Sequence, residues 1–294
     1  MNAGIVPNLS KKDIFKILDS LITKLTSAGI DVYLQKELDL PAEFYETIKN
    51  KITDCESDCF FSKSEIILSL GGDGTMLSTA YDARKYDVPL AGINIGKLGF
   101  LAEVNMADLD SFINSIKLKN YNVEDRMTIK AACPGVNNSN MFAVNDIVID
   151  KGMWPKMIEL TIFVDDEYVS TFTADGVIIA TPTGSTGYAL STGGPIVFPK
   201  SSSIIISPIA PHTLTMRPLV LSSDQKINIR VTSQNKSFQV NCDGQRVHQF
   251  DAPGEISIEK SNRPLKLLHT KTSGYFEILR EKLFWGQDIR QNSN

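Results

Sequence analysis

The sequence has little of what marks several large classes of protein. Its 294 residues include only four cysteines and three histidines, and their spacing fits neither a disulfide framework nor a structural zinc site. No apolar run approaches the roughly 18 residues of a membrane-spanning helix, and the first residues lack the apolar core of a signal peptide. These absences predict a reduced, cytoplasmic protein that does not enter a membrane.

The chain also lacks an excess of positive charge. Thirty Lys and Arg residues against 34 Asp and Glu residues give a formal net charge of −4, which argues against a nucleic-acid-binding protein. Apolar residues make up 42% of the chain, enough for a sizeable core and too many for a disordered protein. A length of 294 residues favours two domains or one large one.

Short apolar runs alternate with helically spaced apolar residues over residues 1–120. The predicted strands are 3–6, 30–34, 65–70 and 88–95, and the predicted helices are 14–25, 41–51 and 76–85. Ser10 and Asp13 resemble a capping box ahead of the first helix. The alternation is typical of an α/β domain, Rossmann-like and with a mostly parallel sheet.

After about residue 121 the sequence changes to short segments rich in Val, Ile, Thr and Phe. The predicted strands are 127–132, 141–149, 157–164, 177–181, 204–207, 227–231, 238–241 and 256–259. Turn signals such as Asp165–Asp166 and Asp243–Gly244 separate them. We therefore expect a β-rich, β-sandwich-like domain over residues 121–269. A helical pattern at 275–285 predicts that residues 270–294 return to the first domain.

GGDGT at 71–75 follows a predicted strand and opens a helix, at the edge of an open α/β sheet where ligands bind. It is not a Walker A loop or a GxGxxG fingerprint, and the chain also lacks the protein-kinase signatures. Glycine lets backbone amides approach an anion closely, and a helix N-terminus favours phosphate oxygens. The phosphate-binding candidates are Gly71, Gly72, Gly74 and Thr75. A carboxylate repels phosphate, so Asp73 fits a divalent-cation ligand or a general base, unless it only caps the helix.

A second candidate segment is DGVIIATPTGSTGYALSTGGP at 175–195, a strand followed by a loop of Gly, Ser and Thr. Such a loop offers hydroxyl and amide groups without charge, which suits the binding of ribose, amide and phosphate oxygens. A flexible linker has a similar composition, but Pro182, Tyr188 and Leu190 favour an ordered loop.

Six segments, in this order along the chain, strongly resemble the NAD kinase family. They are GGDGT at 71–75, GINIGKLGFL at 92–101, VNDIVI at 144–149, the segment at 175–195, APHTLTMRPLVL at 210–221 and CDGQ at 242–245. The family transfers the γ-phosphoryl group of ATP, or in some members of inorganic polyphosphate, to the 2′-hydroxyl of the adenosine ribose of NAD, which gives NADP. The resemblance implies an α/β domain followed by a β-rich domain, a divalent cation such as Mg²⁺ that acts mainly through ATP oxygens, and a homodimer or homotetramer.

The resemblance also implies roles for individual residues. Asp73 matches the family's proposed general base, which would deprotonate the ribose hydroxyl, and Gly74 lies beside NAD. Asn145 and Asp146 match an Asn-Glu pair whose carboxylate holds a ribose, with Asp here in place of Glu. The other matched NAD-binding positions are Phe100, Lys156, Thr173, Asp175, Thr186, Gly187, Tyr188, Ala189, Leu190, Ser191 and Gln245. No metal-binding residue is assigned.

Some of these matches are more specific than others. Asp175 matches a residue on the nicotinamide side of the dinucleotide, and Tyr188 is a candidate packing surface for the adenine. Lys156 fits a phosphate contact or an exposed, solvated side chain. Thr173 stands where some relatives have Arg, which leaves the acceptance of NADH open.

Two other functions are compatible with part of this pattern. A GGDGT turn also occurs in diacylglycerol and sphingosine kinases, but a lipid kinase needs an apolar entrance where residues 182–194 offer hydroxyls and glycines. A non-catalytic NAD(P)-binding sensor would share the fold, but Asp73 and the complete glycine turn argue against it.

Overall fold

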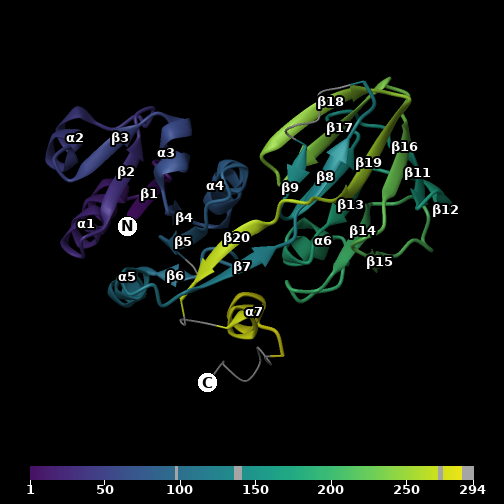
Figure 1. The fold of residues 1–294 in the computed structure, drawn as a ribbon. Helices are drawn as coiled ribbons and strands as arrows, with labels where there is room; N and C mark the ends of the chain where they lie inside the picture. Colours follow the sequence, from purple (N-terminus) through teal and green to yellow (C-terminus); the bar gives the residue numbers. More distant parts are fainter. Residues whose placement is uncertain (97–98, 136–140, 271–273, 287–294) are drawn as a thin grey trace, which may run out of the picture. The chain divides into compact units, whose positions relative to one another are not determined.

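The computed structural model describes residues 1–96, 99–135, 141–270 and 274–286 (Figure 1). Its contacts divide the chain into two compact units, Met1–Asp125 with Leu265–Asn294, and Arg126–Pro264. Each unit has a hydrophobic core of its own. Within the described ranges, no helix is both long enough and apolar enough to span a membrane.

The first unit is built on an eight-stranded sheet. Its strands are β1 (Asn2–Pro7), β2 (Asp31–Gln35), β3 (Ile52–Cys55), β4 (Ile66–Gly71), β5 (Leu90–Asn94), β6 (Val104–Asn105), β7 (Asn122–Arg126) and β20 (Leu265–His269). Its helices are α1 (Ile14–Ser27), α2 (Ala42–Ile48), α3 (Ser57–Lys63), α4 (Asp73–Lys85), α5 (Leu109–Lys117) and α7 (Tyr275–Leu283), with a 3₁₀ turn at Met106–Asp108. The predicted α/β class is therefore correct for this part of the chain.

The order of the strands locates a ligand-binding edge. The sheet runs β3-β2-β1-β4-β5-β20-β7, with β6 beside β5, and strands β1 to β5 pair in parallel. The chain leaves β1 toward β2 and leaves β4 toward β5, so the connections diverge between the neighbouring strands β1 and β4 (Figure 1). In open α/β sheets this switch point is where the carboxyl ends of the strands receive a ligand.

Helices cover both faces of this sheet because its central strands are apolar on both sides. Ile66 and Leu68 of β4 belong to the same core cluster as the apolar faces of α1 and α5. The alternate side chains of β4 face α4, where the hydroxyl oxygens of Ser69 and Thr79 lie 3.4 Å apart. A strand buried on both faces is expected in the middle of a parallel sheet.

The start of α1 differs from the prediction. Asp13 precedes the helix with a φ of 58° and makes no capping hydrogen bond through its side chain. The Ser10 hydroxyl instead donates to Asn8 Oδ1 at 2.7 Å. The predicted capping box is therefore wrong, because the left-handed turn at Asp13, rather than a side-chain cap, directs the chain into the helix.

The second unit is a β-sandwich. Its strands are β8 (Ile129–Ala132), β9 (Phe142–Ala143), β10 (Asp146–Asp150), β11 (Ile158–Val164), β12 (Glu167–Ala174), β13 (Gly176–Ala180), β14 (Ser203–Ile209), β15 (Leu219–Ser222), β16 (Ile227–Thr232), β17 (Ser237–Cys242), β18 (Arg246–Asp251) and β19 (Gly254–Lys260). They form two six-stranded sheets, in the orders β15-β14-β13-β10-β17-β18 and β12-β11-β16-β19-β8-β9. A 3₁₀ turn at Thr183–Thr186 and the short helix α6 (Tyr188–Ser191) follow β13. The predicted β-rich, sandwich-like class is confirmed.

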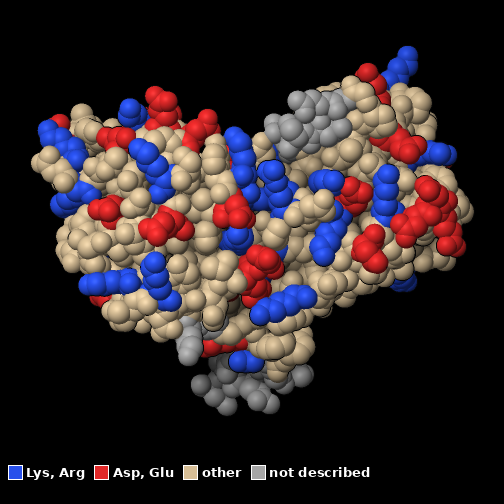
Figure 2. Space-filling model, in the orientation of Figure 1, with Lys and Arg blue, Asp and Glu red and all other residues tan. Residues whose placement is uncertain are grey.

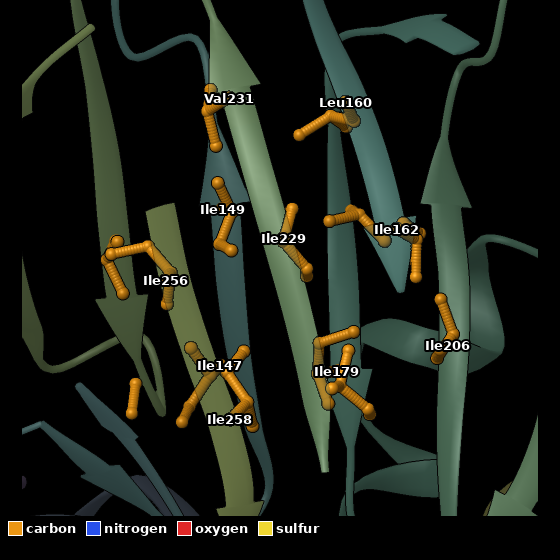
Figure 3. Packing of buried hydrophobic residues seen from close by; sticks show 14 of the residues in the cluster. Ile147, Ile149, Leu160, Ile162, Ile179, Ile206, Ile229, Val231, Ile256 and Ile258 are labelled. Atoms are coloured by element: carbon orange, nitrogen blue, oxygen red, sulfur yellow. The ribbon is translucent and has the colours of Figure 1, made fainter. Parts of the chain in front are cut away.

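One core joins the two sheets of the sandwich. Ile147 and Ile179 come from one sheet, Ile229 and Ile258 from the other, and all four are fully buried in the same cluster (Figure 3). Burying a side chain of this size contributes roughly 1.5–3 kcal/mol relative to leaving it exposed. The alternation of these residues with outward-facing ones fixes the register of each strand.

Candidate active site

The GGDGT segment lies at the switch point, and its acidic residue begins the helix. Helix α4 starts at Asp73, three residues before the predicted start. Asp73 Oδ1 accepts hydrogen bonds from the backbone amides of Leu101 and Ala102 at 3.0 Å each, and Oδ2 accepts one from Phe100 at 2.9 Å. The carboxylate therefore ties the turn after β4 to the loop after β5.

Four glycines near this carboxylate fall into two kinds. A Cβ atom on Gly99 would lie 2.0 Å from Asp73 Oδ1, and one on Gly71 would lie 2.3 Å from Thr75 Oγ1. These two glycines are required by close approach within the chain. Gly72 and Gly74 would meet nothing within 4 Å. The open space beside these two glycines leaves room for a ligand at the N-terminus of α4.

Two further residues reach this turn from other elements. Asn8 follows β1, and its Nδ2 donates to Thr75 Oγ1 at 3.1 Å, which bridges the switch point. Lys282 of α7 places its Nζ 3.5 Å from Asp73 Oδ2. The sequence analysis missed both. Asn8 was detectable because it lies two residues beyond the predicted strand 3–6. Lys282 lies 209 residues from Asp73, and no sequence pattern around it points to this site.

The second unit contains a pocket of about 240 Å³. The lining residues are Asn145, Asp146, Val148, Asp150, Tyr188, Asn241, Asp243 and Gly244. Three of them, Asn145, Asp146 and Tyr188, are predicted NAD-binding residues. The pocket therefore brings together residues that lie up to a hundred positions apart in the sequence.

Asp243 organises the backbone of this pocket. Its Oδ1 accepts from the amides of Asn145 and Asp146 at 2.7 and 3.2 Å, and its Oδ2 accepts from Val144 at 3.0 Å. Arg246 pairs with the same carboxylate at 3.2 Å. A Cβ on Gly184 would lie 2.0 Å from the carbonyl oxygen of Asn145, so this glycine lets the 183–186 turn pack against residue 145.

The pocket is rich in buried hydrogen-bond acceptors. Burial, and then the neighbouring Asp243 carboxylate, raise the pKa of Asp146 to about 7. Burial also raises the pKa of Asp150, against the opposing effect of a hydrogen bond from the Gly152 amide. Among the described residues, the Oδ1 atoms of Asn145 and Asn241 are buried without a hydrogen-bond partner. A ligand that fits here must supply hydrogen-bond donors, as ribose hydroxyls and an exocyclic amine do.

The predicted segment 186–191 borders the pocket, with its residues in different roles. A Cβ on Gly187 would lie 3.7 Å from both Asn145 Nδ2 and Asp146 Oδ2. Tyr188 is half exposed, and its neighbour Ala189 is fully buried in the core. The remaining residues do not line the pocket: Thr186 Oγ1 contacts the Thr183 carbonyl, Leu190 is half-buried and Ser191 is exposed.

Four other predicted residues lie outside the lining of this pocket. Asp175 forms an ion pair with Lys151 at 2.6 Å, and Lys156 donates to Gln234 Oε1 at 3.0 Å. Thr173 is exposed on β12 and Gln245 is exposed after the turn that follows β17. The structure thus groups Asp73 with Phe100 and Gly74 in one unit, and Asn145 with Asp146 and Tyr188 in the other.

The described part of the chain contains no group of three or more His, Cys, Asp or Glu side chains that could hold a metal ion. Asp73 in particular already accepts three backbone amides, which uses most of the lone pairs of a carboxylate. These residues do not form a cation cage of their own. All four cysteines are free thiols.

The fold and the two sites define a two-domain, nucleotide-binding α/β-plus-β protein. Residues 3–121 match the model of the ATP-NAD kinase N-terminal domain, and residues 144–270 match that of the ATP-NAD kinase C-terminal domain. The chain belongs to the NAD kinase family.

Curated relatives agree over almost the whole chain. It is 38% identical to an NAD kinase of Caldanaerobacter subterraneus subsp. tengcongensis over 284 residues, which covers 95% of this chain and 98% of that one. An NAD kinase of Chlorobium phaeobacteroides is also 38% identical, with 98% of each chain covered.

Two solved structures share the fold. An NAD kinase from Archaeoglobus fulgidus in complex with ATP superimposes with a TM-score of 0.73 at 28% identity, covering 97% of this chain and 98% of that one. Yeast NADH kinase complexed with NADH gives a TM-score of 0.86 at 24% identity, covering 98% and 89%. The second likeness concerns the fold alone.

Proposed function

We propose that this chain is an NAD kinase that transfers the γ-phosphoryl group of ATP to the 2′-hydroxyl of the adenosine ribose of NAD. The products are ADP and NADP. The observation that supports this most is the Asp73 carboxylate, which is fixed by three backbone amides at the switch point of a chain of this family. Membership of the family supports the choice of NAD over a lipid as acceptor.

Asp73 is suited to the role of general base because it is fixed in place and still accessible. Its side chain is 30% exposed. Asp243 accepts three backbone amides in the same manner, yet its side chain is 0% exposed. In our proposal Asp73 takes the proton of the ribose hydroxyl while Gly72, Gly74 and neighbouring amides bind phosphate oxygens.

In the second unit, we assign the dinucleotide to the acceptor-rich pocket. Asp146 and Asn145 would accept hydrogen bonds from ribose hydroxyls or the adenine amine, and Tyr188 would pack against a flat ring. The other residues of the family pattern, including Asp175, Lys156 and Gln245, remain proposed NAD contacts outside this pocket.

We treat the divalent cation as part of the substrate. Because the described residues form no cation cage, Mg²⁺ would arrive bound to ATP oxygens, where it neutralises charge on the phosphoryl group. Inorganic polyphosphate as an alternative donor and NADH as an alternative acceptor are open specificities of the same site.

We also propose a homodimer or homotetramer in the cytoplasm. In the described part of the chain, β15 is the last strand of its sheet and exposes Leu219 and Val220, a surface that a second copy of the chain can cover. The free thiols fit a reducing compartment. On the face shown in Figure 2, acidic and basic side chains are interspersed on both units.

The direct test is NADP formation by the purified chain with MgATP and NAD, followed with an NADP-specific dehydrogenase. Parallel reactions replace ATP by polyphosphate, NAD by NADH, and NAD by diacylglycerol. We expect NADP from ATP and NAD and no phosphorylated lipid. Binding of NAD without any NADP would instead identify a non-catalytic sensor.

A further inference from the structure

Helix α7 brings a basic residue to the proposed reaction centre. Lys282 Nζ lies 3.5 Å from Asp73 Oδ2 and 5.0 Å from the centroid of the Phe100 ring. The Lys282 side chain is 28% exposed, so it is neither fully solvated nor closed off from a ligand.

Lys282 occupies a position where the helix pattern calls for an apolar residue. Tyr275, Ile278, Leu279 and Lys282 follow the spacing i, i+3, i+4, i+7, which places them on one helix face. Ile278 and Leu279 are buried, and the Tyr275 ring lies 6.5 Å from the Phe100 ring. The stripe that packs α7 onto its unit therefore ends in an ammonium group beside Asp73. A partly buried charge costs stability unless it is paired, and the pairing of Lys282 is the 3.5 Å contact with Asp73 Oδ2.

The described residues that form the Asp73 turn and its anchoring loop provide no cation, and Lys97 of the same loop lies outside the described residues. Neither residues 71–75 nor residues 99–102 include a Lys or Arg, although the polyphosphate of ATP is strongly anionic. Among the described residues, the one polar partner of Lys282 is Asp73, at a long 3.5 Å. An ammonium group has three N–H donors, so Lys282 keeps donors for phosphate oxygens.

We propose that Lys282 is a catalytic residue that binds the transferring phosphoryl group, an inference that rests on the proposed NAD kinase activity. When MgATP enters, the ammonium group turns from Asp73 Oδ2 to the γ-phosphate oxygens. Oδ2 accepts only one backbone amide, and it is then free to take the proton of the 2′-hydroxyl.

In the phosphoryl transfer, every bond that breaks is matched by one that forms, and Lys282 carries the same charge throughout. The bond between the γ-phosphorus and the oxygen that bridges it to the β-phosphate breaks, and its electrons leave with ADP. A new bond forms between the 2′-oxygen and the γ-phosphorus, and the hydroxyl proton moves to Asp73. Lys282 keeps its proton and stabilises the charge on the transferring oxygens.

The test compares three full-length variants, Lys282→Met, Lys282→Arg and Arg280→Met. Arg280 is an exposed basic residue of the same helix and serves as the matched control. The main readout is the ratio of the Kd for MgADP to the Kd for MgATP, measured by calorimetry without NAD. Loss of an interaction with the γ-phosphate changes this ratio, whereas a general loosening of α7 changes both Kd values together.

For Lys282→Met we expect the ratio to fall about tenfold with the Kd for MgADP unchanged, and kcat to fall about tenfold or more. Lys282→Arg should restore most of the ratio, and Arg280→Met should match the unmodified chain. An unchanged ratio in Lys282→Met, or equal losses for both nucleotides, would overturn the inference. The ratio does not depend on NADP formation, so a failure of the proposed function would show separately, as the absence of NADP from the unmodified chain.

Discussion

At the scale of single residues, the two units contain the same hydrogen-bonding arrangement around an Asp carboxylate, but the two carboxylates have different roles. Asp73 accepts hydrogen bonds from the three consecutive backbone amides of residues 100–102, and Asp243 accepts them from those of residues 144–146. Asp243 is closed off and paired with Arg246, so it can only support the backbone. The Asp73 side chain is 30% exposed, so in our proposal it supports the loop and also acts as the base. Exposure, not residue type, separates the two roles.

Because Asp73 anchors the loop and is also the proposed base, the substitution Asp73→Asn should lower both the stability and the activity of the protein. The amide group would lose the charge needed to take a proton and would point an NH₂ group at a backbone N–H of residues 100–102. We expect kcat to fall about a hundredfold or more, and the free energy of unfolding to fall by about 1–3 kcal/mol. Steady-state kinetics and urea unfolding measure the two effects. A kcat within tenfold of the unmodified enzyme would remove Asp73 from the role of base.

We expect the affinity for NAD to depend on pH through Asp146. Its pKa in the free protein is raised to about 7, so the carboxylate is mostly ionised at pH 8 and mostly protonated at pH 6. If the ionised form accepts the ribose hydroxyls, the KM for NAD should rise about tenfold from pH 8 to pH 6. Asp146→Asn should raise KM at pH 8 and abolish this dependence. A KM that is flat in the unmodified enzyme would show that the carboxylate does not bind the ribose in its ionised form.

At the scale of secondary structure, the loop after β5 depends on one glycine. Gly99→Ala would place a methyl group 2.0 Å from Asp73 Oδ1, and the carboxylate or the loop must then move. We expect kcat to fall about tenfold or more, as misplacement of a catalytic group predicts. Gly96→Ala is the control, because the nearest described atom to its Cβ would be Asn94 Oδ1, at 3.8 Å. Equal activity of the two variants would contradict the anchoring role of Asp73.

The elements that could be predicted from the sequence are those with a strong pattern. Helix α1 and strands β4 and β5 were found because their apolar residues are continuous or regularly spaced. The turns at Asp165–Asp166 and Asp243–Gly244 were also correct, and both residues of each pair have positive φ.

Most of the missed elements are short or exposed, but helix α5, which buries Leu109, Phe112, Ile113 and Ile116, was also missed although its apolar residues are regularly spaced. The segment 41–51 was predicted as one helix, but α2 ends at Ile48 and β3 begins at Ile52. Strands β12 and β15 lie at sheet edges and expose most of their residues, so their sequences show no buried face. Burial, which decides these cases, depends on partners far away in the chain.

At the scale of the whole molecule, the candidate site is only partly readable from the sequence. Asp73, Asn145 and Asp146 lie in recognisable motifs. Lys282 and Asn241 do not, because the fold alone brings them to Asp73 and to the acceptor-rich pocket. Residues 271–273 and 287–294 of the predicted C-terminal segment lie outside the described residues.

The proposed assembly gives a prediction at this scale. We expect light scattering after size-exclusion chromatography to give two or four times the chain mass of 32.5 kDa. Val220→Lys on the exposed edge strand β15 should shift the mass toward that of one chain if this edge forms the contact. A single-chain mass for the unmodified protein would rule out the proposed oligomer.

The central claim is that this chain phosphorylates one particular hydroxyl of NAD. The most direct measurement is ³¹P NMR of the product formed from MgATP and NAD. The account predicts one new phosphomonoester resonance, on the 2′-carbon of the adenosine ribose, formed in step with ADP. A phosphate on any other hydroxyl, or ADP formed without a phosphorylated dinucleotide, would contradict it.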